Sequence, residues 1–351
     1  MGVMEIGGQS MVGAIRKILL KQPREAFVDR ARVEAQWRGL GFVGPPDLER
    51  AAAEYDHFVD VLRRFEMEVH FLPRDDETGL DSIYVHDPLV VCDRGVVLCR
   101  MGKEARRGEP EAAGRFLAQA GVPILGRITG EGCLEGGDVV WIDERRVAVG
   151  QGYRSNAEGI RQFRDILGDA VDEVLPVPLP HWDGPEDVLH LMSLLSPIDR
   201  DLAVAYPRLL PVPFLQWLEG LGIRLVEVPD AEYDNMACNV LALAPRRCLM
   251  LAGNPKTRRL LEEAGADVWT YEGREISFKG SGGPTCLTRP LLRLPAPPPR
   301  AATREAPEGL SEGERSPEPD DRDEPAGWET PEKAGDPDDV DPDEVDPASQ
   351  I

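Results

Sequence analysis

A cysteine follows a run of glycines near the end of the apolar part of the chain. Residues 279–292 read KGSGGPTCLTRPLL, so Cys286 comes shortly after Gly280, Gly282 and Gly283. Glycine lacks a Cβ atom, so the backbone there can adopt positive φ and approach a ligand closely. A thiol in this place could therefore face a pocket and serve as a nucleophile. The alternative is a small buried hydrophobe, the state of most free cysteines.

An acid and a histidine also stand inside apolar segments. Glu135 follows Leu134 and precedes a Gly-Gly pair, and a buried carboxylate needs a cationic partner or a raised pKa. His190 alternates with apolar residues in LHLMS, which fits either a general acid and base or a core histidine bonded to backbone. Both residues are candidates for chemistry beside Cys286.

Further charged residues lie in the connections of the chain. Asp81 and Asp87 bracket SIYVH, and this even spacing predicts that both lie on one face of a strand. Asp87 precedes a proline, so it is equally typical of the start of a turn. Arg106 and Arg154 lie in connecting segments, where most arginines are solvated.

The other cysteines and histidines indicate neither disulfides nor a metal centre. The six cysteines include no CxxC pair, and in a reducing compartment they are expected to be free thiols. The five histidines lack metal-ligand spacing, because His181 and His190 are too far apart to share one helical face. We therefore expect no metal and no cofactor.

The charge of the chain constrains its partners. The 351 residues carry a formal net charge of −23, which argues against nucleic acid and suits a cationic small molecule. The sequence lacks an apolar run long enough to span a membrane and an apolar secretory signal. These features predict a cytoplasmic protein, and a homodimer is one of the oligomeric states left open.

Composition divides the chain into three parts. From residue 297 onward there are 18 Asp and Glu, 5 Lys and Arg, and 11 Pro, with almost no large apolar side chains. Such a segment cannot bury enough apolar surface to offset its ordering entropy. We expect a disordered acidic tail at 297–351, a folded catalytic domain at 14–296 and a flexible N-terminus at 1–13.

The folded part repeats one pattern about every fifty residues. Stretches starting at Arg94, Arg145, Arg200 and Arg246 each contain an apolar run, a Gly- or Pro-containing connection, an amphipathic helix and a second apolar run. A looser copy opens the chain, and one further apolar strand separates successive copies. The pattern predicts an α/β fold of five strand-strand-helix-strand modules arranged in a ring with pseudo-five-fold symmetry.

The residues capable of chemistry occupy matching places in this repeat, in or next to the connecting strands. They are Asp81, His86 and Asp87 in the first connecting strand, Glu135 and Asp138 in the second, His190 in the third, Asn239 in the fourth and Cys286 in the last. Equivalent positions in a ring face the same axis. The topology therefore predicts one pocket that collects carboxylates, a histidine and a thiol.

At these residues the chain resembles the guanidine-modifying superfamily of five-bladed ββαβ propellers, the penteins. The matching motifs are DSIYVHDP, LEGGDV, GYRSNAEG, HLMS and GGPTCLT, in the family's order across most of residues 16–293. Any one of these motifs is weak, whereas five in order are specific. The likeness is greatest to the dimethylarginine dimethylaminohydrolase branch, which implies hydrolysis of an N-methylated arginine to citrulline and an amine.

The resemblance implies a role for each candidate residue. Cys286 would be the nucleophile, His190 the general acid and base, and Glu135 the carboxylate that grips the guanidinium. The implied substrate-binding residues are Asp81, His86 and Asp87 for side-chain nitrogens, and Arg106 and Arg154 for the α-carboxylate.

Two positions depart from the family pattern. The deiminases carry an acid where this chain has Met192, and a thioether suits N-methyl groups, which favours a methylated arginine. Dimethylarginine hydrolases often have Glu where this chain has His86, which could admit a different guanidine. Arginine deimination, transfer of the amidino group to an amine, and a non-catalytic propeller that binds a ligand are the alternatives.

Overall fold

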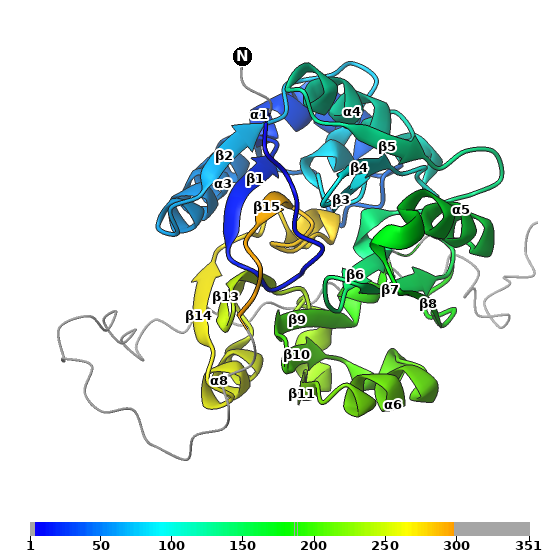
Figure 1. Cartoon of the computed structure of the whole chain (residues 1–351). Helices are drawn as coiled ribbons and strands as arrows, with labels where there is room; N and C mark the ends of the chain where they lie inside the picture. The colour runs from blue at the N-terminus through cyan, green and yellow to red at the C-terminus, as the bar shows by residue number, and fades with distance from the viewer. Residues whose placement is uncertain (1–3, 186, 188, 298–351) are drawn as a thin grey trace, which may run out of the picture. The chain divides into compact units, whose positions relative to one another are not determined.

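Five three-stranded sheets build the part of the chain that the computed structural model describes, residues 4–185, 187 and 189–297. In each sheet the middle strand pairs antiparallel with one neighbour and parallel with the other. A helix connects the two parallel strands and lies on the outside of the ring, as Figure 1 shows. The prediction of a five-bladed ββαβ propeller is confirmed.

The blades follow one another along the chain, each with its outer helix. Their elements are β15 (Arg289–Arg293), β1 (Ile15–Leu20), α3 (Leu48–Arg63) and β2 (Glu68–Phe71) in blade one; β3 (Leu89–Cys92), β4 (Gly95–Leu98), α4 (Glu109–Gln119) and β5 (Ile124–Arg127) in blade two; β6 (Val139–Trp141), β7 (Arg146–Gln151), α5 (Ala157–Leu167) and β8 (Glu173–Pro178) in blade three; β9 (Leu195–Asp199), β10 (Leu202–Ala205), α6 (Val212–Gly220) and β11 (Arg224–Glu227) in blade four; and β12 (Leu241–Ala244), β13 (Arg247–Leu251), α8 (Pro255–Glu263) and β14 (Asp267–Tyr271) in blade five. Three short helices lie in connections, namely α1 (Pro23–Ala26), α2 (Arg30–Gln36) and α7 (Asp230–Tyr233).

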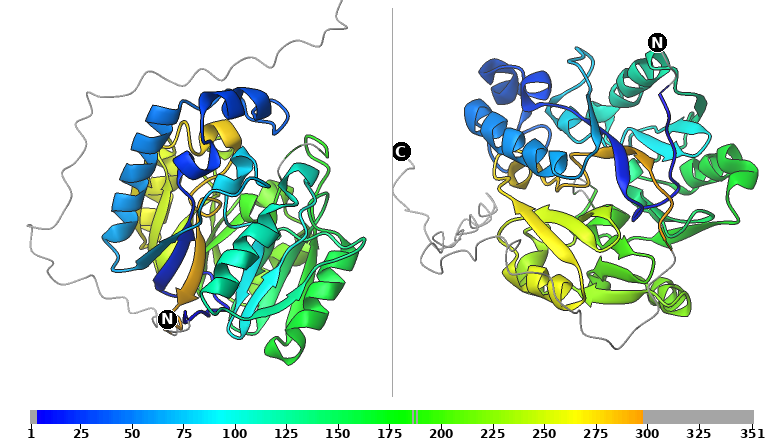
Figure 2. Two further views of the ribbon diagram at one scale, coloured as in Figure 1. Left: turned by 90° about the horizontal axis from the view of Figure 1, so that it is seen from above. Right: turned by 60° about the vertical axis from the view of Figure 1, so that its left-hand side comes forward.

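The ring is closed by strands from opposite ends of the folded part. β15 pairs antiparallel with β1, with Ile15 opposite Arg293 and Leu19 opposite Arg289. Figure 2 shows these two strands side by side in both views. Because Cys286 lies just before β15, this closure brings the end of the folded chain next to its beginning.

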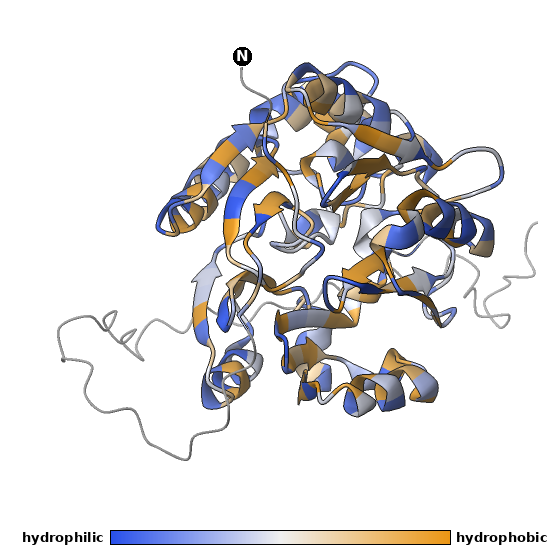
Figure 3. Ribbon diagram, in the orientation of Figure 1, coloured by the Kyte–Doolittle hydropathy of each residue, from blue (hydrophilic) through white to orange (hydrophobic). Residues whose placement is uncertain are grey.

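The outer helices are held by apolar faces and defined ends. In α5 the side chains of Ile160, Phe163 and Leu167 are buried, at the helical spacing read from the sequence. The Asn156 side chain accepts a hydrogen bond from the N–H of Gly159, and Gly168 ends the helix with φ 52°. Figure 3 shows this pattern, with hydrophobic colour in the strands and mixed colour on the helices.

The N-terminal segment differs from expectation. Residues 4–13, expected to be flexible, pack against the ring: the N–H of Gly7 donates to the Leu291 carbonyl at 2.8 Å. The Gln9 side chain is buried and donates to the carbonyl oxygens of Glu144 and Ala170. These contacts join the segment to three separate parts of the chain.

The connecting strands are shorter than predicted, and the candidate residues precede them. Short 3₁₀ turns at Leu80–Ile83, Gly136–Asp138 and Leu191–Ser193 stand where strands were expected. The prediction that Asp81 and Asp87 share one face of a strand is therefore wrong, because Asp81 lies in a 3₁₀ turn and Asp87 in the loop after it. Glycine-rich and polar sequences such as EGGD satisfy their backbone groups in turns.

Two remaining expectations concern membranes and the tail. Within the described residues, no helix combines the length and the apolar character needed to cross a bilayer. The predicted disordered tail at 297–351 lies outside the described residues except for Pro297.

Candidate active site

One cleft opens beside the turns that precede β3, β9 and β15, each the first strand of its blade. The cleft has two lobes. The Asp81 lobe is lined by residues that include Leu40, Asp81, Tyr84, Lys103, Arg106 and Arg154. The Trp182 lobe is lined by residues that include Val43, Trp182, Leu189, Tyr233, Met236 and Phe278. Both lobes share His190 and Cys286 in their walls.

A buried ion pair forms one wall of the cleft. His190 Nε2 lies 2.7 Å from Glu135 Oε2, and both side chains are almost completely buried. Burial alone would lower the pKa of His190, but the nearby carboxylates of Asp87, Asp138 and Glu135 raise it to about 9. Burial likewise opposes ionisation of Glu135, yet the hydrogen bond and charge of His190 bring the pKa of that carboxyl below its usual value. We therefore describe the pair as imidazolium and carboxylate at neutral pH.

The backbone around this pair is held by a second acid. Asp138 is fully buried, accepts a hydrogen bond from the Ser155 hydroxyl at 2.5 Å and another from the N–H of Leu191 at 3.0 Å. The Ser155 oxygen in turn accepts from the N–H of Glu135. Burial raises the pKa of Asp138 to about 6. The turn that carries Glu135 is thereby bonded to the turn that carries His190.

Asp87 reaches the cleft beside His190 and is paired behind with an arginine. Arg106 Nη1 lies 2.6 Å from Asp87 Oδ2, and Arg106 also donates from Nε and Nη2 to Glu109. Burial opposes the charge of Asp87, but Arg106 and then His190 outweigh it and hold the pKa of this carboxyl far below its usual range. Asp87 Oδ1 is 3.9 Å from His190 Nδ1, so this acid faces the imidazole from the side opposite Glu135.

Cys286 approaches the same point from the other side of the ring. Its sulfur accepts a hydrogen bond from Asn239 Nδ2 at 3.2 Å, and the N–H of Thr285 donates to Asn239 Oδ1. Burial and the negative charge of Asp87 raise the pKa of Cys286 to about 12. Cys286 is therefore an uncharged thiol at neutral pH.

The glycines that drew attention in the sequence permit close packing. A Cβ at Gly282 would lie 2.2 Å from the Tyr84 ring, and one at Gly283 would lie 2.6 Å from Asn239. A Cβ at Gly137 would lie 2.4 Å from His190 Nδ1. Larger residues at these positions would displace the side chains that form the cleft.

Three predicted binding residues are in the cleft but engaged with protein groups. Asp81 Oδ2 lies 2.7 Å from Lys103 Nζ, and Arg106 is committed to Asp87 and Glu109. Arg154 Nη2 donates to the Asp187 carbonyl at 3.2 Å, and its Nη1 is 3.7 Å from Glu135 Oε2. That Nη1 atom finds no hydrogen-bond partner among the described residues.

Other predicted positions lie elsewhere. The His86 side chain, expected to bind substrate, is buried away from the cleft with Nδ1 2.8 Å from the Thr288 carbonyl. Burial and the charge of Arg289 keep the pKa of His86 well below its usual value. Met192, expected to meet N-methyl groups, is buried in the hydrophobic core around β9 and β10. Glu135 lies behind His190, whereas Asp81, Asp87 and Asp187 line the Asp81 lobe, and Asp183, Asp187 and Asp234 line the Trp182 lobe.

Some residues of the site were missed by sequence reasoning. Lys103 was given no role, although its N–H donates to Glu135 Oε1 at 3.1 Å and its side chain enters the Asp81 lobe. Asn239 and Asp138 were noted in the repeat without an assigned role. The signal that could have raised all three is their position in the repeat: Asn239 and Asp138 stand in turns equivalent to those of Cys286 and His190, and Lys103 lies in a connection equivalent to that of Arg154.

The site contains one cluster with the composition of a metal centre. One ligand atom each from Asp87, Glu135 and His190 lies within 4.8 Å of the others. Each of the three already has a charged protein partner, namely Arg106 for Asp87 and the mutual pair for the other two. Arg106 and the imidazolium thus supply the positive charge that balances the two carboxylates.

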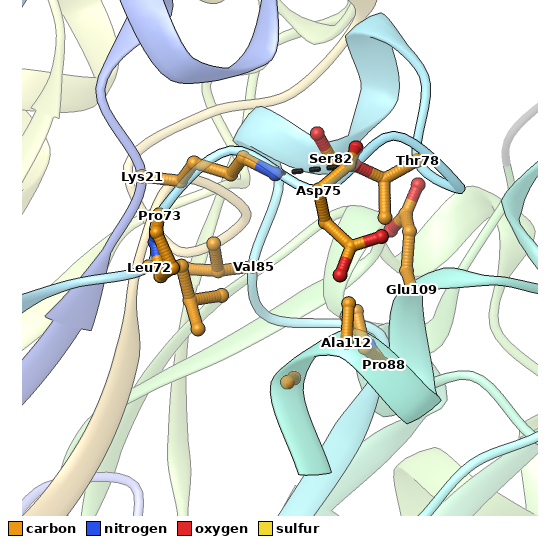
Figure 4. Close-up of a pocket in the computed structure, with 11 residues that line it drawn as sticks. Lys21, Leu72, Pro73, Asp75, Thr78, Ser82, Val85, Pro88, Glu109 and Ala112 are labelled. Atoms are coloured by element: carbon orange, nitrogen blue, oxygen red, sulfur yellow. Dashed lines mark hydrogen bonds between the residues drawn. The ribbon is translucent and has the colours of Figure 1, made fainter. Parts of the chain in front are cut away.

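A separate small cavity, shown in Figure 4, is lined by residues that include Glu109, the partner of Arg106. Lys21 points into it and donates to the Thr78 hydroxyl at 3.2 Å. Burial raises the pKa of Glu109, which lines this cavity, to about 7, although Arg106 opposes that shift. Asp87 is therefore supported from behind by a buried charge network and not by bulk water.

Comparison with known proteins agrees with this geometry. Residues 46–293 match the family model described as "N,N dimethylarginine dimethylhydrolase, eukaryotic". The N(G),N(G)-dimethylarginine dimethylaminohydrolase of Pseudomonas aeruginosa is 28% identical over 78% of this chain and 98% of its own length. An arginine deiminase of Rhodococcus opacus is 30% identical over 46% of this chain and 47% of its own length.

A solved structure extends the likeness to three dimensions. The Pseudomonas aeruginosa hydrolase, a cysteine-to-serine variant in complex with citrulline, superposes with a TM-score of 0.64 at 26% identity. The match covers 80% of this chain and 100% of that one. The family model alone covers more than half of the chain. The chain therefore belongs to the N,N-dimethylarginine dimethylhydrolase family of enzymes, which hydrolyse C–N bonds of guanidino groups.

Proposed function

We propose that this enzyme hydrolyses N-methylated arginine to citrulline and a methylamine through a covalent intermediate on Cys286. The observation that carries the proposal is that Cys286, His190 and Asp87 line one lobe of the cleft, with Glu135 paired to His190 behind its wall. A guanidinium is a planar cation with directed N–H donors, and carboxylates match both properties. The acid that would bind it first is Asp87, because Asp87 lines the cleft and its charge is secured by Arg106.

Binding of the cation prepares the nucleophile. The Cys286 thiol is neutral because burial and the charge of Asp87 raise its pKa. A guanidinium seated on Asp87 would cancel that negative field and stabilise a thiolate, which releases its proton to solvent. The thiolate then attacks the guanidinium carbon and forms a C–S bond.

His190 would serve both halves of the reaction. As an imidazolium it donates a proton to the departing methylamine while the C–N bond breaks, which leaves an S-alkylthiouronium on Cys286. The neutral imidazole then accepts a proton from a water that attacks the same carbon, and the C–S bond breaks to release citrulline. Glu135 holds the imidazole at 2.7 Å throughout and favours its charged form.

The Trp182 lobe offers space for N-methyl groups. Leu189, Met236 and Phe278 line this lobe next to Cys286 and His190. Asp183, Asp187 and Asp234 line the same lobe, so only part of its wall is apolar. That part costs less to cover with methyl groups than with the N–H donors of an unmodified guanidinium. This lobe replaces Met192 as the structural reason to favour a methylated substrate.

Arginine deimination is the second candidate, and the likeness to an arginine deiminase over part of the chain favours it. The two candidates share every proposed step except the leaving group, which is ammonia in one and a methylamine in the other. Assays of purified enzyme with dimethylarginine and with arginine, scored for citrulline, dimethylamine and ammonia, separate them.

The decisive experiment is a trapped adduct. Wild-type enzyme quenched during turnover should carry a mass increase on Cys286, and Cys286→Ser should lose both the adduct and citrulline formation. Cys133→Ser is the matched control, because Cys133 is a free and partly exposed cysteine outside the cleft. Full activity in Cys286→Ser would refute the proposed nucleophile.

A further inference from the structure

A lysine of the protein occupies the ammonium-binding groups of the cleft. Lys103 Nζ donates to the Leu40 carbonyl at 2.6 Å and to Asp81 Oδ2 at 2.7 Å. All three residues line the Asp81 lobe, as does Cys286. The Lys103 side chain is 19% exposed, so its ammonium sits at the wall of the lobe and is not buried beneath it.

A carbonyl and a carboxylate together form a receptor for an ammonium group. An ammonium presents three N–H donors and no acceptor, and its strongest partners are anionic oxygens. The α-ammonium of an amino acid has the same charge and donors as Lys103 Nζ. An amino acid substrate would therefore compete with Lys103 for Leu40 and Asp81, and the two positive charges would repel each other.

The carboxylate end of a substrate would contact other side chains of this lobe. Arg154 is 5% exposed and lines the same lobe, and its Nη1 lacks a hydrogen bond within the described part of the chain. Arg106 is already bound by Asp87 and Glu109. Arg154 Nη1 and the third N–H of Lys103 are thus two donors in the wall of this lobe that a carboxylate could engage.

We propose that Lys103 is a specificity-determining residue that acts as an internal competitor for the α-ammonium of the substrate. Lys103 lowers the ratio of kcat/KM for α-amino guanidines to that for guanidino acids that lack an amino group. Its own positive charge attracts the carboxylate of both kinds of compound. The inference rests on the proposed function, because it concerns the substrate of the same cleft.

The test compares two substrates and two lysines. Initial rates are measured with dimethylarginine and with the same compound lacking the α-amino group, for wild type, Lys103→Met and Lys279→Met. Lys279 is the matched control: its side chain is 18% exposed, and its Nζ also binds a carboxylate, of Glu275, and a carbonyl, of Pro45.

In Lys103→Met the ratio of kcat/KM for the amino acid to that for the deaminated compound should rise about tenfold, because Leu40 and Asp81 become free for charge-assisted bonds. The rise should come from a lower KM for the amino acid, with kcat changed less than about twofold. Lys279→Met should leave the ratio unchanged.

An unchanged or lower ratio in Lys103→Met would overturn the inference, as would an equal rise in Lys279→Met. Its failure is separable from failure of the proposed function. If wild type turns over neither compound, the proposed function fails, and calorimetric binding of both compounds to Cys286→Ser with and without Lys103→Met decides the role of Lys103. If the double variant binds the amino acid more tightly than Cys286→Ser does, and binds the deaminated compound no more tightly, the role of Lys103 is supported. If the two proteins bind the amino acid with equal affinity, that role is refuted.

Discussion

The two sides of the cleft stabilise their reactive groups in opposite ways. On the ion-pair side, Asp87, Arg106, Glu135 and His190 are buried charges, each in contact with an opposite charge. On the thiol side, Cys286 is surrounded by Asn239, Tyr84 and glycine backbone, and its sulfur is neutral. Charges on the first side exist before any ligand binds, whereas the charge on sulfur would form after a cation arrives. A nucleophile kept in the thiol form is protected from unwanted reaction until substrate is present.

The largest effect is expected from the imidazole at the boundary of the two sides. His190→Asn should lower kcat by about 10² to 10⁴, the usual contribution of a general acid and base. His181→Asn is the control, since His181 is exposed and contacts the Tyr153 hydroxyl. Steady-state citrulline formation measures both variants. Retention of most of the activity in His190→Asn would remove the proton-transfer role from this side of the cleft.

Removal of the central cation should unbalance the ion-pair side. Arg106→Met leaves the carboxylates of Asp87 and Glu109 buried without their partner, which should cost about 3 to 5 kcal/mol of unfolding free energy. The neighbouring Arg107→Met removes an exposed pair with Glu104 and should change stability by less than about 0.5 kcal/mol. Urea denaturation compares the two. Equal stabilities would mean that the network around Arg106 is solvated in solution.

The thiol side should reveal its protonation state by its reactivity. Because the pKa of Cys286 is raised to about 12, the thiolate fraction, and with it the rate of alkylation by iodoacetamide, should rise about tenfold per pH unit between about pH 6 and 9. Mass spectrometry after timed quenching follows Cys286 separately from the other cysteines. An alkylation rate that stops rising near neutral pH would show that Cys286 is already a thiolate. The two sides of the cleft would then both carry charge before a ligand binds.

The smallest effect is expected from the amide that contacts sulfur. Asn239→Ala removes a neutral hydrogen bond of about 0.5 to 1.5 kcal/mol, so kcat/KM should fall about threefold to tenfold. The loss of this donor should also move the pKa of Cys286 further upward, which the alkylation assay can detect. Asn235→Ala, which alters contacts with Asn254 outside the cleft, is the control. A loss as large as that of His190→Asn would assign Asn239 a more direct role.

The architecture could be predicted because it follows from sequence patterns between residues that are close in the chain. The apolar spacing in α5, its Asn156 cap and its Gly168 end each depend on neighbours within about four residues. Repetition of that pattern gave the number of blades, since a module with one apolar face must pack against its neighbours. The same logic placed Cys286, His190 and Asp87 at one centre.

The details of the site could not be predicted in this way. Spacing suggested a strand through Asp81 and Asp87, but the turn at Leu80–Ile83 satisfies its backbone groups locally. The resemblance to the guanidine-modifying superfamily suggested that Met192 lies beside the substrate, whereas packing of β9 and β10 buries it in the core. A sequence records which residue types are near in the chain and does not record which side of a turn each side chain takes.

The amino-acid order by itself determined the five modules, the outer helices and the convergence of a thiol, an imidazole and carboxylates. The tertiary structure decided which charges are paired: Arg106 with Asp87 and Glu109, His190 with Glu135, and Lys103 with Asp81. The physical reason is the separation along the chain between the groups that interact. Helix and strand patterns arise from contacts a few residues apart, whereas a buried charge selects its partner among groups that meet only after the ring has closed.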